Sequence, residues 1–201
     1  MDKDPLETWR NFLDPEVLRP NLMLASIYIA TYEILKDSIM RRLRELFVRG
    51  FDETGELVGP DYKIEVLDKN KSPLYASLEW LKESDAITDD DVTIFNLVKQ
   101  HRNNIAHEIS HMLSEGLPPD FSDRFNEMVS LLSKIERWWI VNYEIPLNPE
   151  LVGEEIIESE IVPGPIASLR MMIDVALGSE ERSNFYINEF RKNFPKPISP
   201  S

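Results

Sequence analysis

Apolar residues recur every three or four positions along most of this chain, and few glycines or prolines interrupt the pattern. The longest such stretch follows Pro20, where Leu24, Ile27 and Ile34 are among the apolar positions. This spacing puts apolar side chains on one face of an α-helix. The sequence therefore predicts one long helix over about residues 21–49.

The same spacing predicts several shorter helices further along the chain. Before the first of them, residues 51–71 contain Gly55, Gly59 and Pro60. This segment is expected to be a loop, with a short extended piece at 62–67. The shorter helices are predicted at about residues 72–84, 88–114, 121–143, 165–177 and 180–194.

The helix predicted at 88–114 has recognisable boundary residues at both ends. Thr88 precedes three aspartates, so its hydroxyl can accept a hydrogen bond from a free backbone amide, and the acids favour the positive end of the helix dipole. Gly116, Pro118 and Pro119 follow the other end, where such residues stop a helix. These boundaries enclose every histidine of the chain.

The composition changes after about residue 145. Residues 150–160 hold five glutamates, and residues 195–201 hold three prolines. The sequence predicts an all-α fold, an up-and-down bundle of about four main helices over residues 1–145. Residues 146–201 are expected to form an acidic linker, a short helical extension and a frayed tail.

The chain of 201 residues has no cysteine, which excludes disulfides, iron–sulfur clusters and thiolate zinc sites. Its first residues do not have the basic and then apolar pattern of a signal peptide. The longest apolar run, residues 22–34, is broken by Ser26, Thr31 and Glu33, so no membrane-spanning segment is expected. A cytoplasmic protein is the expectation.

Arg102 occupies an unusual position on the helix that carries the histidines. Successive helical residues are about 100° apart, which places Arg102 within the apolar stripe that includes Phe95 and Ile105. A guanidinium on such a face is costly unless it is paired or reaches a polar cleft. A buried carboxylate such as Asp85 or Glu136 is an expected partner.

His107 lies on another face of the same helix. It is roughly 140° around the axis from Arg102 and about 7.5 Å along it. The two side chains can therefore meet only if the helix is distorted or if two such helices pack in a symmetric dimer. His101 and His111 are expected to be exposed to solvent.

Residues 102–107 read Arg-Asn-Asn-Ile-Ala-His, which resembles the motif of the HEPN superfamily: an arginine, a polar residue and, a few residues later, a histidine. The predicted helical bundle with a long first helix agrees with this family over about residues 20–145. The resemblance implies a metal-independent endoribonuclease without a cofactor, working as a homodimer with a composite active site. Family analogy also suggests a toxin or phage-defence effector restrained by a regulatory or antitoxin protein.

The resemblance assigns a role in RNA cleavage to each residue of the motif. An imidazole titrates near neutral pH, so His107 would take the proton of the 2′-hydroxyl. Arg102 would stabilise the negative charge that develops on the phosphorane. Asn103 would orient the imidazole or hold a phosphate oxygen. The products would carry a 2′,3′-cyclic phosphate and a 5′-hydroxyl.

The charge of the chain limits how RNA could bind. The 22 basic and 36 acidic residues give a formal net charge of −14, whereas broad nucleic-acid-binding surfaces are normally basic. A small basic cleft remains compatible with this charge. Arg41, Arg42, Arg44 and Arg49 form a basic cluster near the end of the first long helix. They could hold RNA phosphates or complement the negative end of the helix dipole.

Two alternatives stay open. His107-Glu108-x-x-His111 fits the helical zinc-peptidase pattern, with Glu127 as a third ligand, but no sheet is predicted to bind a peptide substrate. A non-catalytic bundle that dimerises or binds a partner is the other alternative, and in it the histidine helix would serve only the packing.

Overall fold

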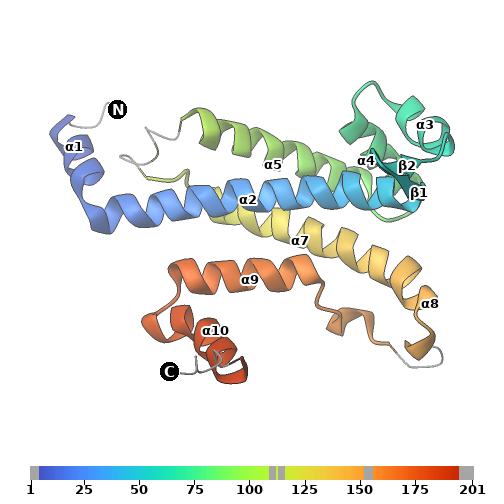
Figure 1. Cartoon of the computed structure of the whole chain (residues 1–201). Helices are drawn as coiled ribbons and strands as arrows, with labels where there is room; N and C mark the ends of the chain where they lie inside the picture. Colours follow the sequence, from blue (N-terminus) through green and yellow to red (C-terminus); the bar gives the residue numbers. More distant parts are fainter. Residues whose placement is uncertain (1–4, 109–111, 113–115, 152–155, 195–201) are drawn as a thin grey trace.

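The computed structural model describes residues 5–108, 112, 116–151 and 156–194. The fold is all-α, as predicted, with one small hairpin in the described part. Three long helices run side by side: α2 (Pro15–Leu46), α5 (Asp89–His107) and α7 (Phe121–Trp139) (Figure 1). The shorter helices α4 (Pro73–Glu83) and α9 (Gly164–Leu177) pack against α2, and α10 (Glu180–Asn193) follows α9.

Helix α2 is the central helix of the bundle and contacts α4, α5, α7 and α9. At 32 residues it is about 48 Å long. It begins earlier than the predicted residue 21, because the Asp14 side chain accepts a hydrogen bond from the Glu16 amide at 2.9 Å and Pro15 suits a first helical position. A preceding short helix, α1 (Pro5–Leu13), contacts its start. Fully buried side chains such as Tyr28, Leu35 and Leu43 form its core face.

The prediction of an extended piece at residues 62–67 is wrong. Strands β1 (Val48–Asp52) and β2 (Gly55–Val58) form an antiparallel hairpin just before it, and α3 (Asp61–Glu65) follows. Gly55 has a φ of 120°, which only glycine adopts without strain, so the chain can reverse there. The strands are largely exposed, so they show no alternation of apolar and polar residues.

Helix α5 begins where the sequence predicted. Thr88 and Asp91 form a reciprocal capping box: the Asp91 amide donates to Thr88 Oγ1 at 3.3 Å, and the Thr88 amide donates to the Asp91 carboxylate at 2.7 Å. The helix ends at His107, earlier than the predicted residue 114. Residues 109–111 and 113–115 lie outside the described residues.

Helix α7 continues into a π-helical turn and a short helix before the chain turns toward α9. The core lies between α2, α4, α5 and α7, and α9 adds Ile166, which is 4% exposed, to the same cluster. The boundary at residues 145 and 146 stays a prediction, but the packing of α9 is continuous with that of the bundle. The remaining short elements are η1 (Leu67–Lys69), η2 (Ile140–Glu144), α8 (Ile145–Leu147), η3 (Pro149–Leu151) and η4 (Glu158–Glu160).

None of the helices in the described ranges is both long and apolar enough to cross a lipid bilayer.

Candidate functional site

Arg102 lies where α5 meets α2, and its guanidinium is held from several sides. Its Nη2 atom lies 2.8 Å from Glu33 Oε1, and its Nη1 atom donates to Asn103 Oδ1 at 3.3 Å. The guanidinium carbon lies 5.4 Å from the centre of the Tyr32 ring, within the range of a cation–π contact. The side chain keeps 30% of its surface exposed. Arg102 is therefore fixed in orientation but still accessible.

The acidic partner of Arg102 differs from the expected ones. Neither Asp85 nor Glu136 contacts it, and Glu33 of α2 takes that place. Hydrogen bonds from Lys36 and then from Arg102 lower the pKa of Glu33, despite its partial burial. The carboxylate therefore stays ionised at neutral pH and can hold the guanidinium. In the sequence Glu33 stood out only because it interrupts an apolar run.

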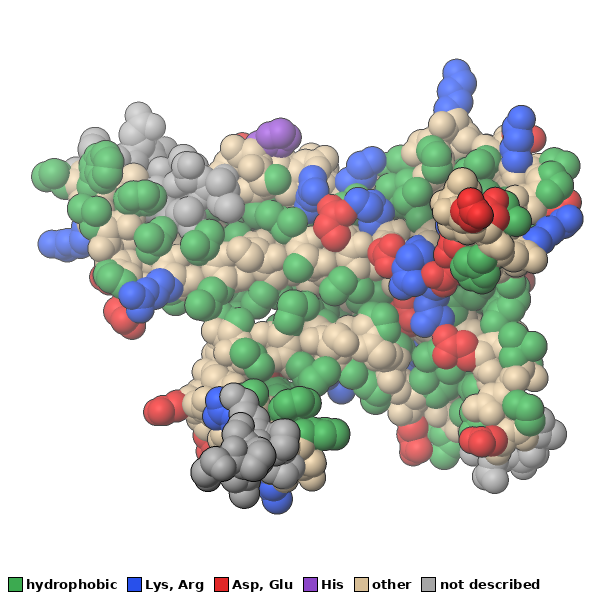
Figure 2. Space-filling view, viewed as in Figure 1, with side chains coloured by type: hydrophobic (Ala, Val, Ile, Leu, Met, Phe, Trp, Pro, Cys, Tyr) green, Lys and Arg blue, Asp and Glu red, His purple; other side chains and the backbone are tan. Residues whose placement is uncertain are grey.

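His107 is the last residue of α5, and its side chain is exposed. A histidine side chain is visible over α5 on the face drawn in Figure 2. Within the described residues no hydrogen bond or ion pair joins His107 to Arg102 or Asn103. One copy of the chain thus presents these groups separately, as the geometry of a straight helix predicts.

His101 is buried, so the expectation that it is exposed is wrong. It is 7% exposed and packs between the rings of Tyr28 and Phe121, at centroid distances of 5.1 and 6.1 Å. Its Nδ1 atom lies 3.9 Å from Asp120 Oδ2. Burial lowers the pKa of His101, an effect that the Asp120 carboxylate opposes and Arg124 reinforces. At neutral pH the ring is therefore an uncharged part of the core.

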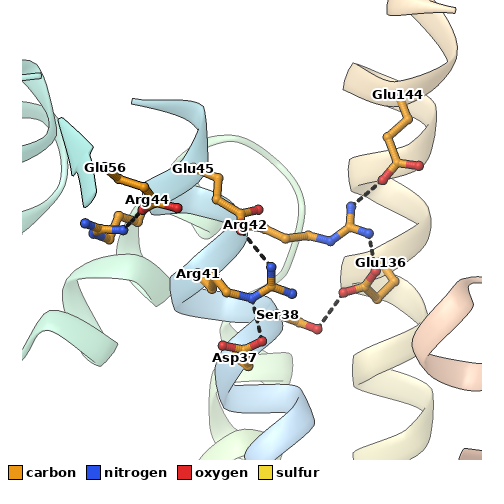
Figure 3. Close-up of polar contacts among 9 residues, drawn as sticks. All are labelled: Asp37, Ser38, Arg41, Arg42, Arg44, Glu45, Glu56, Glu136 and Glu144. Carbon is orange, nitrogen blue, oxygen red and sulfur yellow. Dashed lines mark hydrogen bonds and ion pairs between the residues drawn. The ribbon is translucent and has the colours of Figure 1, made fainter. Parts of the chain in front are cut away.

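The arginine cluster at the end of α2, with Arg49 on β1, is bound to acidic residues. Figure 3 shows Arg42 between α2 and α7, where it lies 2.9 Å from Glu136 and 2.5 Å from Glu144. Ser38 donates a hydrogen bond of 2.5 Å to the other oxygen of Glu136. Glu136 is 1% exposed, and a buried carboxylate is tolerated because these groups compensate its charge.

The other arginines of the cluster have partners closer in sequence. Arg41 contacts Asp37 and Glu45 at 2.7 and 2.6 Å, as Figure 3 also shows. Ion pairs also join Arg44 to Glu56 of β2 and Arg49 to Asp61 of α3. Each of the four guanidiniums predicted to hold RNA thus has at least one carboxylate partner, so the cluster is not a surface of free positive charge.

An open groove of about 700 Å³ lies beside these ion pairs, between α2, α7 and the start of α9. Its charged lining consists of three acidic and three basic side chains: Glu33, Lys36, Asp37, Arg41, Arg42 and Glu136. Glu33 belongs both to this groove and to the ion pair with Arg102. The groove therefore has no excess of positive charge, although it reaches the neighbourhood of the motif.

The alternative zinc ligands are only partly described. His111 lies outside the described residues, and Glu127 on α7 contacts Arg124 at 2.6 Å. Over the described ranges, no group of three or more histidine, aspartate or glutamate side chains is arranged to hold a metal ion.

Comparisons with family models, with curated proteins and with solved structures found no significant match for the chain.

Proposed function

We propose that the chain is a metal-independent endoribonuclease in which Arg102, Asn103 and His107 act on RNA. The observation that carries this proposal is the environment of Arg102, whose guanidinium is fixed by Glu33, Asn103 and Tyr32 yet remains partly exposed. A fixed cation stabilises charge that develops in a transition state without first having to reorganise.

The reaction needs no external nucleophile, because RNA supplies its own 2′-hydroxyl. The 2′-oxygen attacks the adjacent phosphorus while the imidazole of His107 accepts its proton. The bond from phosphorus to the 5′-oxygen then breaks, and that oxygen takes up a proton. A 2′,3′-cyclic phosphate and a 5′-hydroxyl result, and Arg102 binds the phosphoryl oxygens throughout.

The proposal requires a second copy of the chain. His107 has no contact with Arg102 in one protomer, so a complete site needs the two motifs to face each other. In such a pair one imidazole can act as the base and the other can protonate the leaving oxygen. A role as a cytoplasmic toxin or phage-defence effector, with a regulatory or antitoxin partner, extends the proposal by family analogy.

The test is RNA cleavage in excess EDTA by the wild type, His107→Ala and Arg102→Ala. We expect the wild type to leave cyclic phosphate ends and both variants to lose at least about a hundredfold in rate. Gln100→Ala changes an exposed residue of the same helix and serves as the matched control. Equal cleavage by all four proteins, or none by the wild type, would count against the proposal.

A non-catalytic bundle that binds a protein partner is the second candidate. The pairing of Arg41, Arg42, Arg44 and Arg49 with carboxylates favours it, because such guanidiniums are not free to hold phosphates. In that case the wild type neither cleaves nor retains RNA in a filter-binding assay, and His107→Ala behaves as the wild type does.

A further inference from the structure

Helix α10 has 14 residues and no buried side chain, although it carries several large hydrophobic residues. Ile187, Phe190 and Phe194 recur at helical spacing and are 42%, 59% and 67% exposed. An isolated helix of this length is marginal in water, and most helices in proteins are stabilised by packing an apolar face. The exposed stripe of α10 therefore lacks the cover that such a helix needs within the described residues.

Helix α9 also carries exposed apolar residues. Ile166 and Leu169 face the core, whereas Met171 and Val175 are 40% and 51% exposed. We call α9 and α10 together with the following Phe194, residues 164–194, the C-terminal hairpin. Figure 2 shows hydrophobic side chains where α10 projects from the body, next to a hollow in its outline.

The C-terminal hairpin has a defined shape. Tyr186 Oη donates to Asp174 Oδ2 at 3.0 Å, and Ser183 Oγ donates to the Gly178 carbonyl at 3.1 Å. A Cβ atom at Gly178 would lie 2.2 Å from the Asp174 carbonyl oxygen, so this turn requires glycine. The two helices are thus held together at their turn, and their apolar faces form a preorganised surface.

The charge of the C-terminal hairpin differs from that of the whole chain. Its four basic and four acidic residues give a net charge of zero, while the complete sequence has −14. The excess negative charge therefore lies entirely outside residues 164–194. Two copies of the chain repel each other because both carry a net negative charge, and this repulsion is smaller when they approach through the neutral hairpin.

The ends of α10 carry opposite charges. Glu180 and Glu181 lie in its first turn, and Arg191 and Lys192 lie in its last turn. When two such helices pack antiparallel, the acidic end of each faces the basic end of the other. The helix is therefore complementary to a second, antiparallel copy of itself.

We infer that the C-terminal hairpin is an interface between two copies of this chain, related by a two-fold axis, with the α10 helices antiparallel. The apolar area agrees with this occupant. A stable interface of standard size buries about 800 Å² per partner, of which somewhat more than half is apolar. From their exposed fractions, Met171, Val175, Ile187, Phe190 and Phe194 together offer on the order of 500 Å².

This interface is distinct from the composite active site proposed above. Helix α9 packs on α2 and α7, while α5 packs on the other side of those helices (Figure 1). A pair joined through the C-terminal hairpin would hold its two copies of residues 102–107 apart. The inferred interface therefore does not depend on the proposed function, and each can be tested separately.

Sedimentation velocity over a wide concentration range tests the interface. We expect the wild type to dimerise and Phe190→Asp to raise the dissociation constant at least about tenfold. Phe51→Asp, at a 76% exposed position of β1, is the matched control and should leave the constant unchanged. A wild type that stays monomeric, including one whose own terminal residues cover the stripe, would overturn the inference.

A charge-reversal series separates recognition from folding. Arg191→Glu should weaken the dimer, and adding Glu180→Arg should restore it, because an antiparallel pair places these positions against each other. A merely structural role for either residue predicts no such restoration. If the double variant is weaker than Arg191→Glu, the antiparallel arrangement is wrong.

Cross-linking locates the contact directly, since the chain contains no cysteine of its own. Ile187→Cys should form a disulfide-linked dimer on mild oxidation, whereas Phe51→Cys, at an exposed position of β1, should not. No linkage through position 187, or equal linkage through position 51, would overturn the inference.

Discussion

Arg102 can act as proposed only if its guanidinium keeps one orientation, and Glu33 is the charged group that fixes it. Glu33 also pairs with Lys36, so substitutions of two different partners can test the same carboxylate. Both partners of the Arg102 ion pair are at least 30% exposed, and exposed pairs contribute little to stability. Glu33 should therefore contribute to the position of the Arg102 guanidinium and not to the stability of the fold.

We expect Glu33→Gln to lower the rate of RNA cleavage about tenfold while changing the free energy of unfolding by less than about 1 kcal/mol. The measurement is single-turnover cleavage, which separates the chemical step from binding, together with urea unfolding. Lys36→Gln is the control, because it touches the same carboxylate without touching Arg102. Equal rates for both variants would mean that Glu33 does not position Arg102.

The buried His101 predicts how the stability of the protein depends on pH. An unfolded histidine titrates near 6.5, and burial lowers the pKa of His101 in the folded protein. Below about pH 6.5 the unfolded chain binds a proton that the folded chain does not, so stability falls as the pH falls toward the folded value. The nearby charges of Asp120 and Arg124 act in opposite directions and leave this sign unchanged.

We expect the free energy of unfolding of the wild type to fall more steeply than that of His101→Gln between about pH 7.5 and pH 5.5. Urea titrations at several pH values give this difference. Carboxylates that titrate in both proteins cancel in the comparison. Parallel profiles for the two proteins would show that His101 is not the group responsible.

At the scale of elements, helix α9 is tied to the bundle by a few buried side chains. Leu169 is 2% exposed, whereas Leu177 at the end of the same helix is 36% exposed. We expect Leu169→Ala to lower the free energy of unfolding of the whole bundle by about 2–4 kcal/mol, and Leu177→Ala to cost much less. Urea unfolding followed by tryptophan fluorescence reports on the core, which contains Trp139. No change for Leu169→Ala would identify α9 as an appendage.

The helices were predictable because their information is local. Apolar spacing identified α2, α4, α5, α7, α9 and α10, and Thr88 marked the start of α5. The hairpin of β1 and β2 was not predicted, because its short strands are largely exposed and show no alternation of apolar and polar residues. The end of α5 was placed too late, since its apolar spacing continues beyond His107.

The surroundings of the candidate site were harder to predict, because they depend on contacts between distant parts of the chain. The Glu33 to Arg102 pair spans 69 positions, and the Ser38 to Glu136 pair spans 98. Periodicity can place Arg102 on a face of α5, but only the packing of α5 on α2 determines which carboxylate it meets. The burial of His101 likewise depends on where α7 brings Phe121.

At the scale of the whole molecule, the charge is unevenly distributed. The chain has an excess of 14 acidic residues, yet the C-terminal hairpin is neutral and Arg41, Arg42 and Arg44 of α2 are each paired with a carboxylate. The hydrophobic contribution to self-association through this neutral surface should not change with added salt. The contribution of the charge pairs at the ends of α10 should become slightly weaker.

The paired arginines of α2 also determine how ionic strength would act on RNA binding. A phosphate that captures one of these guanidiniums releases a carboxylate, and that carboxylate gathers cations from solution while the RNA gives cations up. The two effects oppose each other, so the logarithm of the affinity should fall with the logarithm of salt concentration much less steeply than the usual slope of about −0.7 per contact for single strands. Glu45→Gln and Glu144→Gln each remove one of the two carboxylate partners of Arg41 and of Arg42. These variants should make the slope steeper. The size of the change would indicate how many guanidiniums exchange a carboxylate for a phosphate when RNA binds.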